Sequence, residues 1–187
     1  MKSLKLFLAF LFTSTSMSFA QSGFAKFVSK TELEFSDGIC LPLDDFHGGS
    51  FKLRYATGLN ARYHFGDSPW KIGAYIQFDN ACRKYRWDDG AHLQKNETCA
   101  AGVTAEYDFR VYKTVNPFIG IGVGGGAQEA TGKVVYPHDG GAVSVIPRIG
   151  VEFWNSIRMN VYTQFSRKGY NTVGLTVGFV LGNKSQL

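Results

Sequence analysis

Hydrophobic and polar residues alternate with a period of two along most of the chain. Leu33 and Phe35 alternate with Glu32 and Glu34, and residues 172–179 alternate Val, Leu and Phe with Thr and Gly. This period places the apolar side chains on one face of a β-strand. Because no stretch shows the 3.6-residue period of an amphipathic helix, the pattern predicts an all-β protein.

Eight alternating segments can be distinguished, each close to the 9–11 residues with which a tilted strand crosses a bilayer. Their connectors differ in length: 66–69 and 154–156 are short, 110–117 is moderate, 36–50, 80–97 and 127–141 are long, and 168–171 is short against the trend. Outer-membrane barrels combine short periplasmic turns with longer outer loops. The chain therefore predicts an eight-stranded antiparallel up-and-down transmembrane β-barrel with both termini in the periplasm.

The polar face of these strands carries charges of both signs and most of the strand glycines. A soluble barrel would turn this face to water, whereas a membrane barrel would enclose it. A basic side chain that faces lipid at mid-bilayer costs about 2–4 kcal/mol, so we expect the charges to neutralise one another inside a closed lumen. The predicted lumen network is Lys26, Lys30, Glu32, Glu34, Arg54, Arg62, Glu106, Arg148, Glu152 and Arg158.

Aromatic residues on the apolar face gather near the predicted strand ends, as in the two interfacial girdles of membrane barrels. The group at the short turns consists of Tyr63, Phe65, Trp70, Tyr107, Phe109 and Phe153. The group at the opposite ends consists of Phe35, Phe51, Phe78 and Phe165.

The first twenty residues have the features of a secretory signal. Lys2 and Lys5 form a positively charged start, and residues 4–12 are nearly all apolar. Small residues at Ser18 and Ala20 predict cleavage after Ala20. The barrel domain is then 21–187, with 18 basic residues against 15 acidic ones. This even, interspersed charge excludes a nucleic-acid partner. Only 19% of residues are charged, against about 25% in soluble proteins.

Export to an oxidising compartment makes a disulfide plausible among Cys40, Cys82 and Cys99. Cys82 and Cys99 flank the second long connector, with the parity of one strand face. A bond between them would stabilise the fold by about 3 kcal/mol in the chain-entropy account. We expect Cys82 to pair with Cys99 and Cys40 to remain free.

Three stretches, 116–126, 147–154 and 173–182, resemble strands of small outer-membrane barrels of the OmpA/OmpX/OmpW type. The last two are most similar to barrel domains of Bacteroidetes. The resemblance implies outer-membrane lipid as a partner, and the barrel-assembly machinery, which would read the last strand. The polar tail after Phe179 departs from the usual C-terminal aromatic signal. Such families include adhesins, surface-defence proteins and narrow transporters, and the fold does not choose among them.

No residue pattern predicts a catalytic, cofactor or metal site. Residues 120–125 match GxGxxG but lie inside a strand without a following helix. Each histidine is followed two residues on by glycine or glutamine, which excludes the His-x-Ser pair of barrel deacylases. We therefore expect a structural, adhesion or surface-interaction role with a possible extracellular ligand. The alternatives are a narrow conduit for small or apolar solutes, a lipid A-modifying enzyme and a soluble ligand-binding barrel.

Overall fold

The computed structural model describes residues 30–44, 50–66, 68–87, 90–111, 113–132 and 139–182. The predicted signal 1–20 and Lys26 lie outside these ranges. The described residues form nine strands: β1 (Thr31–Pro42), β2 (Ser50–Lys52), β3 (Arg54–His64), β4 (Trp70–Trp87), β5 (Gly90–Asp108), β6 (Val115–Thr131), β7 (Gly140–Phe153), β8 (Ile157–Gln164) and β9 (Thr172–Leu181).

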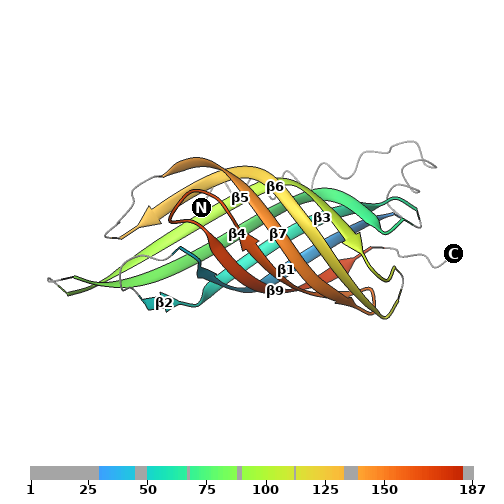
Figure 1. Ribbon diagram of the computed structural model, residues 1–187, viewed down its shortest axis with the longest axis horizontal. Coiled ribbons are helices and arrows are strands. Elements are labelled where there is room, and N and C mark those ends of the chain that lie inside the picture. Colours follow the sequence, from blue (N-terminus) through green and yellow to red (C-terminus); the bar gives the residue numbers. More distant parts are fainter. Residues whose placement is uncertain are drawn as a thin grey trace, which may run out of the picture.

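The sheet closes on itself. β1 pairs with both β3 and β9, the strands β9 to β4 then follow one another in reverse chain order, and every pairing is antiparallel. β2 and β3 pair with successive parts of β4 and lie one after the other. Together they occupy one strand position, so the barrel wall is eight strands around. Figure 1 shows the strands winding obliquely around the long axis. The predicted fold class is thereby confirmed. Within the described ranges, no helix is long and apolar enough to cross a membrane.

The barrel has a polar interior and an apolar exterior. On β4, Lys71, Gln77 and Asp79 are buried, whereas Trp70 and Ile72 are 53% and 49% exposed. The same alternation runs around the wall, and the exposed positions include Val103, Ile119, Val143, Ile149 and Phe179. This arrangement suits lipid outside, because hydrocarbon solvates apolar side chains and leaves charges to pair within.

Aromatic pairs mark the border of the apolar band near the short turns. The rings of Trp70 and Tyr107 lie 5.1 Å apart, and those of Tyr107 and Phe109 lie 5.2 Å apart. Tyr63 and Phe65 form a further pair at 5.5 Å, and the Phe153 ring lies 5.9 Å from that of Trp154.

At the other border the Tyr55 ring stacks on Phe78 at 5.8 Å. From Trp70 to Phe78 the strand rises roughly 27 Å, which a tilt of about 40° reduces to roughly 21 Å, close to the height of a membrane band. Two of the aromatics expected at this border lie elsewhere. Phe35 lies opposite Phe179 in the first half of β1, and Phe51 lies on β2, over Arg83.

Four strands continue well beyond the apolar band. β4 and β5 remain paired up to Trp87 and Gly90, and β6 and β7 pair as far as Gln128 and Gly140. The loop predicted at 80–97 is therefore largely strand, and residues 127–131 and 140–141 of the loop predicted at 127–141 also belong to strands. Polar residues on both faces caused this error, because a strand outside the bilayer needs no apolar outer face. Figure 1 shows the projecting β4–β5 hairpin at the left.

The two neighbouring glycines Gly124 and Gly125 lie on opposite faces of β6, and the space beside them differs. A Cβ at Gly124 would collide with the backbone of β5 at Ala101 and Gly102, whereas one at Gly125 would meet only the Ala142 carbonyl, at 3.6 Å. We expect Gly124→Ala to lower the free energy of unfolding by about 1–3 kcal/mol. Gly125→Ala should change it by less than about 0.5 kcal/mol. Urea unfolding in lipid vesicles measures both, and equal effects would contradict the observed packing.

Candidate functional site

Charged side chains fill the half of the lumen next to the short turns. They come from β1, β3, β4, β5, β7 and β8, and all are at most 9% exposed. We call this group the lumen network: Glu32, Glu34, Arg62, His64, Lys71, Glu106, Asp108, Arg148, Glu152 and Arg158.

Three guanidinium groups converge on Glu106. Its carboxylate lies 2.9 Å from Arg158 Nη2, 3.5 Å from Arg62 Nε and 3.6 Å from Arg148 Nη1. Arg62 also lies 2.5 Å from Glu34 Oε2 through Nη1. Arg62, Arg158, Glu34 and Glu106 therefore each have more than one partner of opposite sign, drawn from different strands. Arg148 pairs with Glu106.

A second centre surrounds Lys71, closer to the short turns. Its Nζ lies 2.7 Å from Asp108 Oδ2, 3.2 Å from Glu32 Oε2 and 3.7 Å from Glu152 Oε2. His64 Nε2 lies 2.6 Å from Glu32 Oε1. Four cations and five carboxylates thus nearly cancel within the network, as burial in a medium of low dielectric constant requires.

The structure brings together only part of the predicted network. Arg54 lies toward the outer end, where its Nε donates to Asn80 Oδ1 at 3.0 Å, so it is not part of the lumen network. Lys30 is half-buried at the start of the barrel, and its carbonyl accepts the His64 N–H. His64, Lys71 and Asp108 were not predicted as members of the network. Each occupies a polar-face position in the alternating pattern, which could have indicated that its side chain points into the lumen.

The predicted Cys82–Cys99 bond is contradicted by the strand register. Cys82 lies opposite Lys95, and Cys99 lies opposite Phe78. The two cysteines are therefore offset by four residues, or roughly 13 Å, whereas a disulfide spans about 4.4–6.8 Å between Cα atoms. Cys40, Cys82 and Cys99 are all free. The error arose because the hairpin extends through the predicted loop, so its turn does not bring the cysteines together.

The outer half of the lumen is polar but carries fewer charges. Asp79 is fully buried and accepts hydrogen bonds from Tyr162 Oη at 2.6 Å, Thr172 Oγ1 at 2.5 Å and Gln77 Nε2 at 2.7 Å. Below this cluster, the guanidinium of Arg148 lies 5.6 Å from the ring of Tyr75. Large side chains therefore occupy the lumen at both levels.

The connection after β8 folds into the outer mouth of the barrel. The Asp44 carboxylate accepts the backbone N–H groups of Gly169 and Asn171, at 2.7 and 3.1 Å, and the Asn171 Nδ2 at 2.7 Å. Asn96 Nδ2 donates to the Gly169 carbonyl. Burial raises the pKa of Tyr170 to about 12, aided by the nearby Asp139, so its hydroxyl stays protonated. The short connection 165–171 is thereby held from Asp44, just after β1, and from Asn96 of β5.

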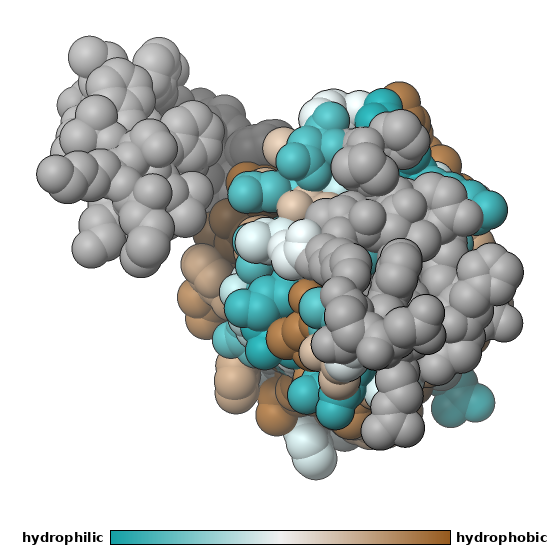
Figure 2. All heavy atoms as spheres, turned by 90° about the vertical axis from the view of Figure 1, so that its left-hand side faces the viewer, coloured by the Kyte–Doolittle hydropathy of each residue, from teal (hydrophilic) through white to brown (hydrophobic). Residues whose placement is uncertain are grey.

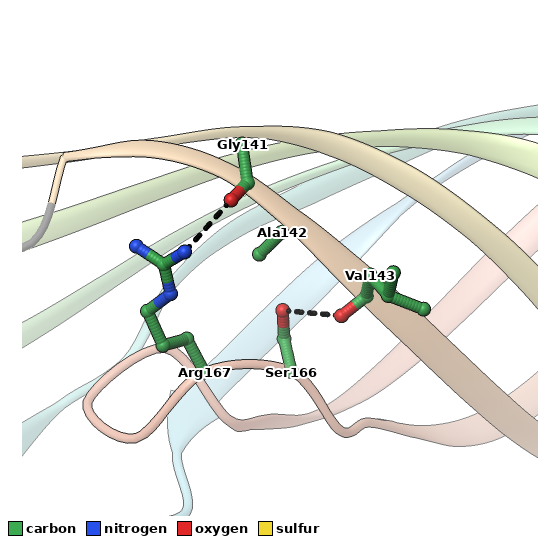
Figure 3. A pocket seen from close by; sticks show the side chains of 5 residues that line it. All are labelled: Gly141, Ala142, Val143, Ser166 and Arg167. Carbon is green, nitrogen blue, oxygen red and sulfur yellow. Dashed lines mark hydrogen bonds between the residues drawn. The ribbon is translucent and has the colours of Figure 1, made fainter.

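The same connection covers part of the β7 edge. β8 ends at Gln164 while β7 continues outward, so the carbonyls of Gly141 and Val143 have no partner strand on this side. Arg167 Nη2 donates to the Gly141 carbonyl at 2.9 Å, and Ser166 Oγ donates to that of Val143 at 3.0 Å (Figure 3). An open pocket of about 500 Å³ lies between this part of β7 and the connection that carries Ser166 and Arg167.

No protein-family model matches the chain, and no curated protein matches it by sequence. Solved structures with a similar fold include Neisserial surface protein A (12% identity, 82% of this chain and 97% of that one, TM-score 0.49). The attachment invasion locus protein Ail of Yersinia pestis, solved with the heparin analogue sucrose octasulfate, is also similar (14%, 81% and 96%, 0.43). So is the outer membrane enzyme PagL (16%, 81% and 99%, 0.43). Within the described residues, no group of histidine, cysteine and carboxylate side chains could hold a metal ion.

Glu106 is the residue whose loss should disturb the network most. Glu106→Gln leaves three buried guanidinium groups with one carboxylate fewer, and breaking such pairs costs about 3–5 kcal/mol. We expect a corresponding fall in the free energy of unfolding, measured by urea titration of the folded barrel. Glu129→Gln, at an exposed position on β6, is the matched control and should change it by less than about 0.5 kcal/mol. Similar losses in both variants would mean that the network does not stabilise the barrel.

Proposed function

We propose that the protein is a closed outer-membrane barrel that holds a β-sheet at the cell surface for interaction with other molecules. The carrying observation is that strands β4 to β7 continue beyond a lumen that side chains and a folded-in connection fill. A conduit requires an open lumen, and it does not require a sheet that projects from the membrane.

The filled lumen argues against a path for solutes. Arg62, Arg158 and Tyr75 are among its largest side chains, and each is at most 2% exposed. Asp44 and Asn96 fix the 165–171 connection over the outer mouth through hydrogen bonds. Opening a path would break these contacts as well as the ion pairs of the lumen network.

The projecting sheet is polar and accessible. Figure 2 faces the end from which β4 and β5 project, and hydrophilic side chains are interspersed with hydrophobic ones on its visible part. A paired sheet is already ordered before it binds. Binding through it therefore loses less conformational entropy than binding through a flexible loop. Attachment, the role in the name of the similar barrel Ail, is the form of interaction that we propose.

We propose that the short turns, together with both termini, face the periplasm. β1 begins and β9 ends at the short-turn end, where Leu33 lies opposite Leu181. Signal cleavage after Ala20 and recognition of the last strand by the barrel-assembly machinery fit this orientation. The exposed apolar residues Phe179 and Leu181 of β9 would then be available to that machinery.

A lipid A-modifying activity is the alternative for which the similar fold of PagL gives a reason. Of the two described histidines, His64 lies inside the lumen against Glu32. His92 lies opposite Tyr85 near the tip of the β4–β5 hairpin, beyond the apolar band, so neither lies on the lipid-facing surface. We therefore propose that the protein is not an enzyme. Mass spectra of lipid A from an overproducing strain should match those from the parent strain, and a lost or added acyl chain would contradict this.

Two measurements test the proposed function. In planar bilayers the folded protein should show no conductance steps, whereas regular single-channel steps would support a conduit. In a non-adherent strain, display of the protein should increase attachment to cultured cells. Replacing residues 82–95 by an Asn-Gly turn should return attachment to the level of the empty strain, because Ala81 and Asn96 are already paired.

The shortened variant must still migrate faster in unboiled than in boiled gel samples, which shows that its barrel is folded. Attachment that persists in this folded variant would contradict a role of the β4–β5 hairpin. Absence of attachment by the intact protein would contradict the adhesive role itself.

A further inference from the structure

Three lysines form a basic patch on the outer flank of the barrel, just beyond the apolar band. Lys52 of β2 and Lys95 of β5 lie on either side of Cys82 of β4 in one cross-strand row. Lys84 follows two residues further out on β4. Adjacent strands are about 4.8 Å apart, so the Cα atoms of Lys52 and Lys95 are separated by roughly 10 Å.

The patch faces sideways, as the lipid-facing residues do. On β4 its parity is that of Ile76 and Phe78, and on β5 it is that of Val103 and Cys99. On β2 the parity is shifted by one residue, because the pairing of β2 with β4 is offset by one from that of β3 with β4. This shift brings Lys52 into the same row as Lys95.

All three lysines are exposed. Within the described residues, no carboxylate lies within ion-pair distance of their ammonium groups. Glu97 and Glu129, which face each other across β5 and β6, lie one outward-facing row nearer the bilayer. Asn80 Nδ2 donates to Glu97 at 2.6 Å. An anion held by the lysines would therefore lie level with them or further out, away from these carboxylates.

The height of the patch matches that of lipid headgroups. Cys82 lies four residues beyond Phe78, which on a tilted strand is roughly 10 Å above the outer end of the apolar band. The exposed Leu93 lies directly opposite Lys84, and the exposed Leu53 follows Lys52. Leucines among the lysines favour a lipid surface over a soluble polyanion.

We infer that Lys52, Lys84 and Lys95 bind the phosphate groups of a phosphorylated glycolipid in the outer leaflet. This inference rests on the proposed placement of the barrel in the outer membrane. Binding there anchors the β2–β4–β5 wall at the membrane surface, directly beneath the projecting sheet. The binding is purely non-covalent, by charge-assisted hydrogen bonds from ammonium groups to phosphate oxygens.

The test measures binding of diphosphorylated lipid A to the folded full-length protein inserted in phosphatidylcholine vesicles. Each lysine near a charged membrane surface is expected to contribute about fivefold in affinity, so Lys52→Gln with Lys95→Gln should weaken binding roughly 30-fold. The charge-matched control, Arg110→Gln with Lys113→Gln, removes two exposed cations at the short-turn end and should bind as the original protein does.

Three further arms separate the possible ligands. Dephosphorylated lipid A should bind the original protein as weakly as diphosphorylated lipid A binds the lysine variant. Inorganic phosphate should not compete at millimolar concentration, and heparin binding should not depend on the lysines. Equal weakening in both double variants, no weakening in the lysine variant, or lysine-dependent heparin binding would each overturn the inference.

Folding is followed separately. If the lysine variant loses the heat-dependent gel shift, Lys52→Arg with Lys95→Arg replaces it, and retained binding by that folded variant is then the expected result. Loss of the gel shift in every protein, including the original, would instead contradict the membrane barrel on which the proposed function depends.

Discussion

A bilayer interior offers no hydrogen-bond partner to a peptide group, and this constraint determines the rest of the structure. Every strand edge must pair, so β1 joins both β3 and β9 and the sheet closes. Closure creates a lumen into which every second side chain of each strand points, and the charged side chains lie there. The lumen network is thus a consequence of closure, and its ion pairs make the burial of so many charges affordable.

The constraint ends where the bilayer ends. Beyond Phe78 the strands need neither an apolar outer face nor closure, and β4 and β5 continue as a projecting hairpin with lysines and carboxylates outside. β8 stops earlier, at Gln164, and the connection that follows turns inward to Asp44 and Asn96. The molecule therefore combines a rigid, filled membrane part with a sheet that stands in water, which is why we favour surface interaction over conduction.

Alternation alone predicted the fold class and the face of most strand residues, because lipid and lumen impose opposite polarity on neighbouring positions. It could not predict where strands end outside the bilayer, since both faces are polar there and strand and loop look alike. The Cys82–Cys99 prediction failed for this reason. Parity placed both cysteines on the same face, but only the register shows that they are four residues apart. Likewise, Arg54 has the parity of the lumen face, but it lies eight residues further out along β3 than Arg62, and parity alone does not show which level of the lumen a residue reaches.

The central claim is that lipid contacts the odd-numbered face of β5 and that the even-numbered face lines the lumen. It is tested most directly by spin labels placed singly at residues 100 to 107 of a cysteine-free chain in lipid vesicles. Collision rates with dissolved oxygen, which is enriched in hydrocarbon, should be high at positions 101, 103, 105 and 107 and low at the positions between. High rates at the even positions, or rates without a period of two, would contradict the account.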